Sequence, residues 1–129
     1  MRREAQMGPH DLIDAWCRAV ETGDAEKVLS FYEEDALLKP TLSSKIRSGL
    51  QAIEDYFVGN EEERGFLKRG IKTVSYKVEK ELYLDHALIV MGVYEFKSDT
   101  ETVKAHFTFV LKESSQQSKI LAQHSSLYH

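Results

Sequence analysis

Cysteine, proline and long hydrophobic runs are all scarce in this chain of 129 residues. The single cysteine, Cys17, cannot form an internal disulfide, and this suits a reducing compartment. The longest uncharged apolar run, residues 87–94, is too short for a membrane-spanning helix. No apolar stretch follows the charged residues after Met1, so no secretory signal is predicted and we expect a cytoplasmic protein.

An excess of basic residues is also absent. Seventeen Lys and Arg residues stand against 21 Asp and Glu residues, which gives a net charge of −4. Broad electrostatic binding to nucleic acid or to anionic lipid needs a basic face. We therefore expect neither a nucleic acid nor a membrane as a partner.

Sequence motifs for metals, nucleotides and nucleophilic catalysis are missing as well. No two of the five histidines have His-x-His or His-x-x-x-His spacing, and Cys17 stands alone. Nothing indicates a Ser-His-Asp triad, a phosphate-binding loop or a nucleotide-binding fingerprint. The sequence predicts no metal site and no cofactor.

The first half of the chain has helical periodicity after a polar tail at residues 1–10. A single domain is expected over residues 11–129, beginning with an amphipathic helix at 11–22. Asp24 is a predicted N-cap for a second helix, with a buried face formed by Val28, Leu29 and Tyr32. A third helix is predicted to start at a capping box, Ser48 to Gln51, and to turn Leu50, Ile53 and Phe57 inward.

The second half alternates between apolar and polar residues, as half-buried strands do. A short edge strand at 36–38 precedes Pro40, and residues 61–70 form a charged connector. Four long antiparallel strands are predicted from residue 71 onward, with a hairpin at 114–118 between the last two. Three helices followed by such strands predict an α+β fold in which a curved sheet wraps around the helices. This arrangement resembles the cone-shaped, cystatin-like fold of the nuclear transport factor 2-like (SnoaL-like) superfamily.

Several short motifs sharpen this resemblance. The stretch from Leu37 to Arg47, LLKPTLSSKIR, resembles one in the calcium/calmodulin-dependent protein kinase II association-domain family, and most closely in its iota-class carbonic anhydrase branch. Residues 53–57, 92–96, 107–110 and 124–126 are similar to further motifs of that branch, in the same order. The first His of the branch's His-His-Ser-Ser motif is Gln123 here. The chain has no kinase motif and is too short to be a kinase.

The resemblance implies a metal-free site. Thr41, Tyr56 and one serine of the pair Ser125 and Ser126 would hold a water molecule and carbon dioxide there. His124 is the expected base, because an imidazole titrates near neutral pH. Strand alternation puts His124 with Ser126 on one face and Gln123 with Ser125 on the other, and it leaves open which pair faces inward.

Other side chains are expected to bind a small ligand in the cone. Arg47 can offset the charge of bicarbonate through a bidentate hydrogen bond. Trp16, Tyr94 and Phe107 belong to an aromatic set that can line an apolar pocket or simply form the core. Tyr56 has the same two interpretations. The two serines can instead merely end a strand, and His124 can instead be a hydrogen-bonded core residue.

Two functions remain open. One is a small-molecule-binding or assembly domain without catalysis, and the other is a carbonic anhydrase-like lyase that hydrates carbon dioxide. The chain also resembles the ketosteroid isomerases in helix order, but their chemistry is not expected, because that resemblance places Trp16, Lys39 and Ala105 at the positions of the catalytic groups. We also expect a homodimer that forms through the outer face of the sheet, around His106 and Thr108.

Overall fold

The computed structural model describes residues 9–114 and 117–128. The N-terminal tail up to residue 8 and the middle of the 114–118 hairpin lie outside the described residues. The elements are, in chain order, α1 (Pro9–Thr22), α2 (Ala25–Leu29), β1 (Tyr32–Lys39), β2 (Arg47–Ser48), α3 (Leu50–Val58), the 3₁₀ helix η1 (Phe66–Arg69), β3 (Thr73–Tyr83), β4 (Ala87–Lys97), β5 (Thr102–Lys112) and β6 (Lys119–Leu127). The α+β fold and the four long strands are as predicted.

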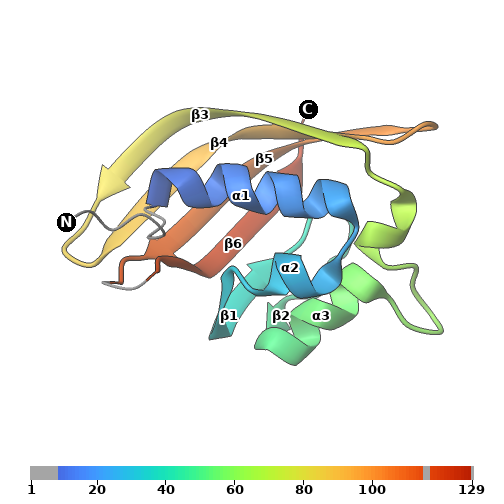
Figure 1. The fold of residues 1–129 in the computed structure, drawn as a ribbon, viewed down its shortest axis with the longest axis horizontal. Helices are drawn as coiled ribbons and strands as arrows, with labels where there is room; N and C mark the ends of the chain where they lie inside the picture. Colours follow the sequence, from blue (N-terminus) through green and yellow to red (C-terminus); the bar gives the residue numbers. More distant parts are fainter. Residues whose placement is uncertain (1–8, 115–116, 129) are drawn as a thin grey trace, which may run out of the picture.

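One curved sheet contains all six strands in the order β2-β1-β6-β5-β4-β3. Strands β3 to β6 pair antiparallel with their neighbours, whereas β1 and β6 run parallel. Helix α1 crosses the concave side of the long strands, and α2 and α3 lie beside β1 and β2 (Figure 1). The sheet and the helices together enclose the core, as the predicted cone requires.

Helix α1 is fastened to the edge strand β3 by polar contacts. Arg18 donates a hydrogen bond to the carbonyl oxygen of Val74 at 2.6 Å, and Glu21 accepts one from its amide at 2.8 Å. Arg18 and Glu21 also form an ion pair, with 3.1 Å between Nη1 and Oε2. These contacts satisfy backbone groups that an edge strand would otherwise leave open.

The core below α1 is rich in aromatic rings. The Trp16 ring stacks on Tyr94 at 5.8 Å and meets Phe109 edge-on at 5.6 Å. All three side chains are buried, together with Ile53 and Phe57 of α3. Leu50 is partly buried against the same cluster. The inward face predicted for the third helix is therefore correct.

Three predictions of local structure are wrong. Helix α2 ends at Leu29 and Tyr32 begins a strand, because the amide of Ile120 on β6 bonds to the carbonyl oxygen of Phe31 at 2.7 Å. Strand β1 is not an edge strand, since it lies between β2 and β6. The capping box is absent because Ser48 belongs to β2, where it pairs with Leu37 of β1. Gly49 is therefore the N-cap of α3.

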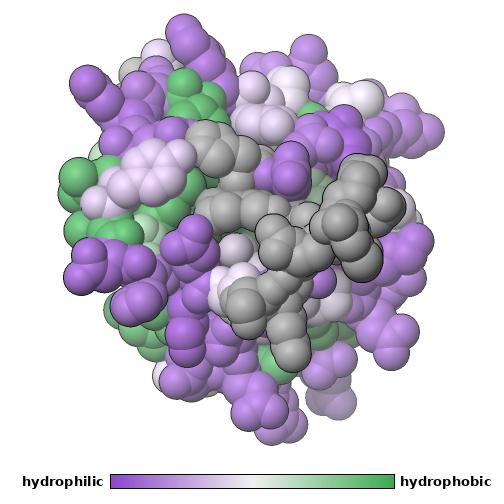
Figure 2. All heavy atoms as spheres, turned by 60° about the vertical axis from the view of Figure 1, so that its left-hand side comes forward, coloured by the Kyte–Doolittle hydropathy of each residue, from purple (hydrophilic) through white to green (hydrophobic). Residues whose placement is uncertain are grey.

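Apolar surface is concentrated at the turn between β3 and β4, where Leu82, Tyr83 and Leu84 are exposed. Figure 2 brings this end of the molecule forward and shows hydrophobic patches set among hydrophilic side chains. Within the described ranges, no helix has the length and the apolar character needed to cross a membrane.

Candidate functional site

A small pocket lies between the sheet and the helices. Its volume is about 20 Å³, which is room for one water-sized molecule. Three of the predicted hydroxyl residues meet in its wall, which consists of Trp16, Leu38, Pro40, Thr41, Tyr56, Phe57, Phe66, Tyr94, Phe96, Gln123 and Ser125. Thr41 comes from the turn after β1, Tyr56 from α3 and Ser125 from β6.

The two aromatic residues expected at a ligand, Trp16 and Tyr94, also line this pocket. Phe107 is not among the lining residues. Its buried ring packs against Tyr94, with ring centroids 4.8 Å apart, and fills the space over Gly92. Phe107 is therefore a core residue that supports the pocket wall from behind.

A chain of hydrogen bonds connects the buried polar groups behind the pocket. The Trp16 indole donates to the Tyr32 hydroxyl at 3.1 Å, and the Tyr32 hydroxyl donates to Gln123 Oε1. Gln123 Nε2 donates to the Tyr94 hydroxyl at 3.1 Å, and the Tyr94 hydroxyl is bonded to Ser125 Oγ. The five side chains are all buried, so these bonds replace the water that each polar group gives up on folding.

Burial keeps the phenol groups protonated. Desolvation raises the pKa of Tyr94 to about 12, although its hydrogen bonds with Ser125 and Gln123 partly oppose this. It also raises the pKa values of Tyr32 and Tyr56 well above 10. For Tyr56, a backbone hydrogen bond from Leu42 and the charges of Arg69 and Arg47 act in the opposite direction. None of these hydroxyls can act as a base near neutral pH.

The structure does not bring His124 and Ser126 to the pocket. Both are exposed on the outer face of the sheet, whereas Gln123 and Ser125 are buried on the inner face. The expectation that His124 is the base in the pocket is therefore corrected, because its side chain points to the opposite side of β6. His106 is also exposed on that outer face, where its ring stacks on Tyr128 at 4.7 Å.

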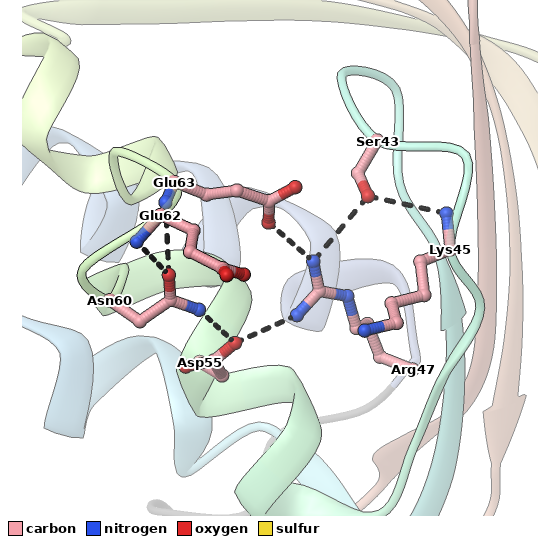
Figure 3. A network of polar contacts seen from close by, with 7 residues as sticks. All are labelled: Ser43, Lys45, Arg47, Asp55, Asn60, Glu62 and Glu63. Atoms are coloured by element: carbon pink, nitrogen blue, oxygen red, sulfur yellow. Dashed lines mark hydrogen bonds and ion pairs between the residues drawn. The ribbon is translucent and has the colours of Figure 1, made fainter.

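Arg47 is already neutralised by other groups. Its guanidinium bonds to Asp55 and Glu63, each at 3.1 Å, and points toward both carboxylates (Figure 3). Ser43 accepts a longer hydrogen bond of 3.4 Å from Nη2. The Arg47 side chain is 5% exposed and is not among the residues that line the small pocket. The expectation of a bidentate bond from Arg47 to bicarbonate is thus not supported.

Arg47 instead stabilises the pocket wall. Its guanidinium carbon lies 5.7 Å from the centre of the Tyr56 ring, a cation–π distance. The loop after α3 holds the guanidinium in place, since Asn60 bonds to Asp55 at 2.9 Å and accepts hydrogen bonds from the amides of Glu62 and Glu63. The charged connector at residues 61–70, which the sequence predicts as a solvated turn or helical loop, contains the helix η1 and also helps to position Tyr56.

A larger cavity adjoins the small pocket at two shared rings. It has a volume of about 200 Å³ and is lined mainly by polar residues, among them Ser43, Asp55, Glu63, Arg64 and Arg69. Tyr56 and Phe66 line both spaces, and their rings stack at 5.7 Å. The larger cavity offers polar surroundings next to the small pocket.

Two members of the buried network escape prediction from the sequence. Tyr32 is predicted on a helix, and Gln123 is noticed only as a departure from a motif. A signal for them does exist, because a buried indole needs an acceptor and Trp16 is the only tryptophan. Two polar residues at successive inward positions of one strand, Gln123 and Ser125, also point to a polar partner in the core.

A metal centre finds no support in the geometry. Among residues 9–114 and 117–128, no group of three or more His, Cys, Asp or Glu side chains is placed to hold a metal ion. The lining of the small pocket consists of hydroxyl, amide, indole and apolar groups.

Comparison with known proteins gives a family and a set of similar folds. The family model described as metal-independent carbonic anhydrase matches residues 14–127. No curated protein matches.

Solved structures of the same fold cover nearly the whole chain. A calcium/calmodulin-dependent protein kinase II association domain from Xanthomonas campestris is 28% identical, with a TM-score of 0.73 over 99% of this chain and 98% of that one. A cyanobacterial iota-carbonic anhydrase complexed with bicarbonate has a TM-score of 0.84 at 19% identity, over 99% and 93% of the two chains. An association domain from Thiobacillus denitrificans has a TM-score of 0.79 at 14% identity, over 98% and 100%. These likenesses confirm the nuclear transport factor 2-like fold.

Proposed function

The chain belongs to the metal-independent carbonic anhydrase family, and on this premise we propose that it hydrates carbon dioxide reversibly at the small pocket. The observation that carries the proposal is the convergence of Thr41, Tyr56 and Ser125 on one water-sized space. These hydroxyls come from three separate elements of the fold, so their meeting is not a consequence of sequence proximity. The description of the family names the reaction, and the pocket has hydroxyl groups that can orient its reactants.

In the proposed reaction, Thr41 and Tyr56 orient a water molecule toward carbon dioxide. The water oxygen forms a bond to the carbon of carbon dioxide. The electron pair of one C=O π bond moves onto the oxygen atom of that C=O bond, and Ser125 donates a hydrogen bond to this atom. Such a donor stabilises negative charge as it develops. Carbon dioxide approaches from the side of the larger cavity, because Tyr56 and Phe66 line both spaces.

The attacking water must also lose a proton. The tyrosines at the pocket keep their own protons at neutral pH because their pKa values are raised. The described lining of the small pocket contains no carboxylate or imidazole. We propose that the proton passes to a base in the solvent, such as a buffer anion, at the open side of the pocket.

Thr41→Val is the first test of this proposal. The change keeps the shape of the side chain but removes the hydroxyl that orients the water, so the hydration rate should fall at least about tenfold, equivalent to ~1.4 kcal/mol of activation free energy. The measurement is stopped-flow hydration of carbon dioxide with a chelator present. Thr108→Val is the matched control, because Thr108 is on β5 opposite the exposed His124 and should leave the rate unchanged. A wild-type rate equal to that of buffer would refute the proposal.

Self-association through the outer face of the sheet is a second proposal. Its support is a set of apolar side chains in register across β4, β5 and β6, in which Ile89 pairs with Val110 and Val110 with Ala122. Met91, on the same face, is 49% exposed. A second copy of the chain would cover this surface and remove it from water.

Met91→Lys is expected to shift a homodimer toward monomer, because a charge would be buried in the apolar contact. Sedimentation velocity at micromolar concentration gives the readout. Ile46→Lys is the control, since Ile46 is an exposed apolar residue in the loop before β2, away from the long strands. Monomeric wild-type protein at this concentration would contradict the proposal.

A further inference from the structure

The hydrogen-bond chain behind the pocket has a direction, which begins at Trp16. An indole N–H can donate but cannot accept, so the Tyr32 oxygen is the acceptor of the first bond. The Tyr32 hydroxyl then has its own proton available, and it donates that proton to Gln123 Oε1. The first two bonds therefore run in the same direction, toward β6.

Gln123 transmits this direction because its amide has two different ends. Its carbonyl oxygen faces Tyr32, and its NH₂ group donates to the Tyr94 hydroxyl at 3.1 Å. The Tyr94 oxygen thus accepts a bond from Gln123. Either hydroxyl could donate the bond between Tyr94 and Ser125 Oγ, but only donation by Tyr94 gives its buried proton an acceptor among the described residues. Ser125 accepts this bond and keeps its own proton for a group in the pocket.

We infer that Gln123 is a positioning residue that sets the direction of this chain, so that Ser125 faces the pocket as a hydrogen-bond donor. The inference deepens the proposed function and rests on it for the identity of the pocket's substrate. A pocket with a fixed donor selects groups that can only accept, such as the oxygens of carbon dioxide or of a small planar oxyanion. A donor locked before the substrate arrives is pre-organised, and it needs no reorientation during the reaction.

The direction of the hydrogen bonds should hold over a wide pH range, because none of the five side chains in the hydrogen-bond chain changes its charge near neutrality. The titratable groups nearest to it are Cys17 on α1, Tyr56 on α3 and the two tyrosines of the chain itself. Burial raises the pKa of Cys17 to about 12 and raises those of the three tyrosines as well. The nearby cations, Arg47 and Arg69, are each paired with a carboxylate.

Glutamate at position 123 would reverse the last bond. A carboxylate only accepts, so both Tyr32 and Tyr94 would donate to it. Ser125 would then donate to Tyr94 and would turn a lone pair toward the pocket. When protonated, the carboxyl group again has one donor and one acceptor, as the amide does, and it would restore the original direction.

The test uses nitrate, a planar anion that only accepts hydrogen bonds, as a probe of wild type, Gln123→Glu, Gln123→Met and Tyr32→Phe. The readout is the single indole ¹H–¹⁵N resonance, because Trp16 lines the pocket and is the only tryptophan. We expect wild type to bind nitrate with the same affinity from pH 6 to 9. Gln123→Met, which has no charge and cannot direct the chain, should bind about tenfold more weakly at every pH.

Gln123→Glu should bind nitrate weakly at the upper end of this range and regain affinity as the pH falls. Tyr32→Phe should also weaken binding several-fold, although Tyr32 is not among the residues that line the pocket. If Gln123→Met does not fold, the nitrate affinity of Tyr32→Phe alone tests the inference. Wild-type affinity in both of these uncharged variants, or failure of wild type to bind nitrate at all, would overturn the inference.

Two outcomes separate this inference from the proposed function. If wild type binds nitrate as described but hydrates carbon dioxide only at the rate of buffer, the proposed function fails and the role of Gln123 stands. If wild type hydrates carbon dioxide and Gln123→Met equals it in both rate and nitrate affinity at every pH, the inference fails alone.

Discussion

Ser125→Ala is expected to lower the rate of carbon dioxide hydration about 10²-fold, the usual effect of removing one donor to a developing oxyanion. Ser125 is 4% exposed and lines the small pocket, where its hydroxyl also ends the buried chain from Tyr94. Without it, the charge that forms on the substrate oxygen has no partner on that side. The loss should appear in kcat rather than in KM, because the bond matters most in the transition state.

The neighbouring serine provides a matched control. Ser126 has the same side chain and lies on the same strand, but it is exposed on the outer face opposite His106. Ser126→Ala and His124→Ala should therefore hydrate carbon dioxide at the wild-type rate, measured by stopped flow with a chelator present. Equal losses in Ser125→Ala and Ser126→Ala would show that the inner face of β6 is not the catalytic face.

The long elements follow from the sequence because one face of each is apolar. Alternation over residues 103–111 predicts β5, and helical spacing around Trp16 predicts α1. Tyr32 fits the spacing of the second helix equally well, but its backbone forms a strand beside β6, a contact distant in sequence. Ser48 fails as a cap for the same reason, since β1 holds it in a ladder.

The candidate site is only half predictable, because its inward face depends on register. The sequence groups Gln123 with Ser125 and His124 with Ser126, but it cannot say which pair the sheet turns inward. That choice follows from the pairing of β6 with β5, which shifts between Val110 and Leu111. The direction of the buried chain is likewise a tertiary property, since its five members come from α1, β1, β4 and β6.

Arg47 shows how a correct residue can receive an incorrect role. Its position in the LLKPTLSSKIR stretch marks it as functional, and its charge suggests an anion ligand. The sequence does not reveal that the guanidinium of Arg47 is already bonded to the carboxylates of Asp55 and Glu63. Arg47 acts on the site through the ring of Tyr56, not through contact with a substrate.

Gly92→Ala is expected to cause a large loss of stability, about 3–5 kcal/mol in the free energy of unfolding. Gly92 lies in the middle of β4, and a Cβ atom there would stand 2.1 Å from the backbone oxygen of Lys77 on β3 and 2.9 Å from the ring of Phe107. The backbone oxygen cannot move without displacing the strand. Gly92 pairs with Val78, and a bulge in β3 follows directly after Val78.

Gly23→Ala separates this steric effect from the general cost of replacing glycine. Gly23 has a φ of +74°, but a Cβ atom there would meet nothing within 4 Å. Its replacement should cost only the strain of a left-handed backbone, about 1–2 kcal/mol. Thermal unfolding followed by circular dichroism should show that Tm falls by roughly 10–15 °C in Gly92→Ala and by no more than about 5 °C in Gly23→Ala.

The stability at Gly92 also bears on the pocket, because Gly92 pairs with Phe107 and Phe107 packs on Tyr94. A loss of stability in Gly92→Ala as small as that in Gly23→Ala would mean that the sheet behind the pocket deforms easily. The donor chain to Ser125 would then lack the rigid support on which its fixed direction depends.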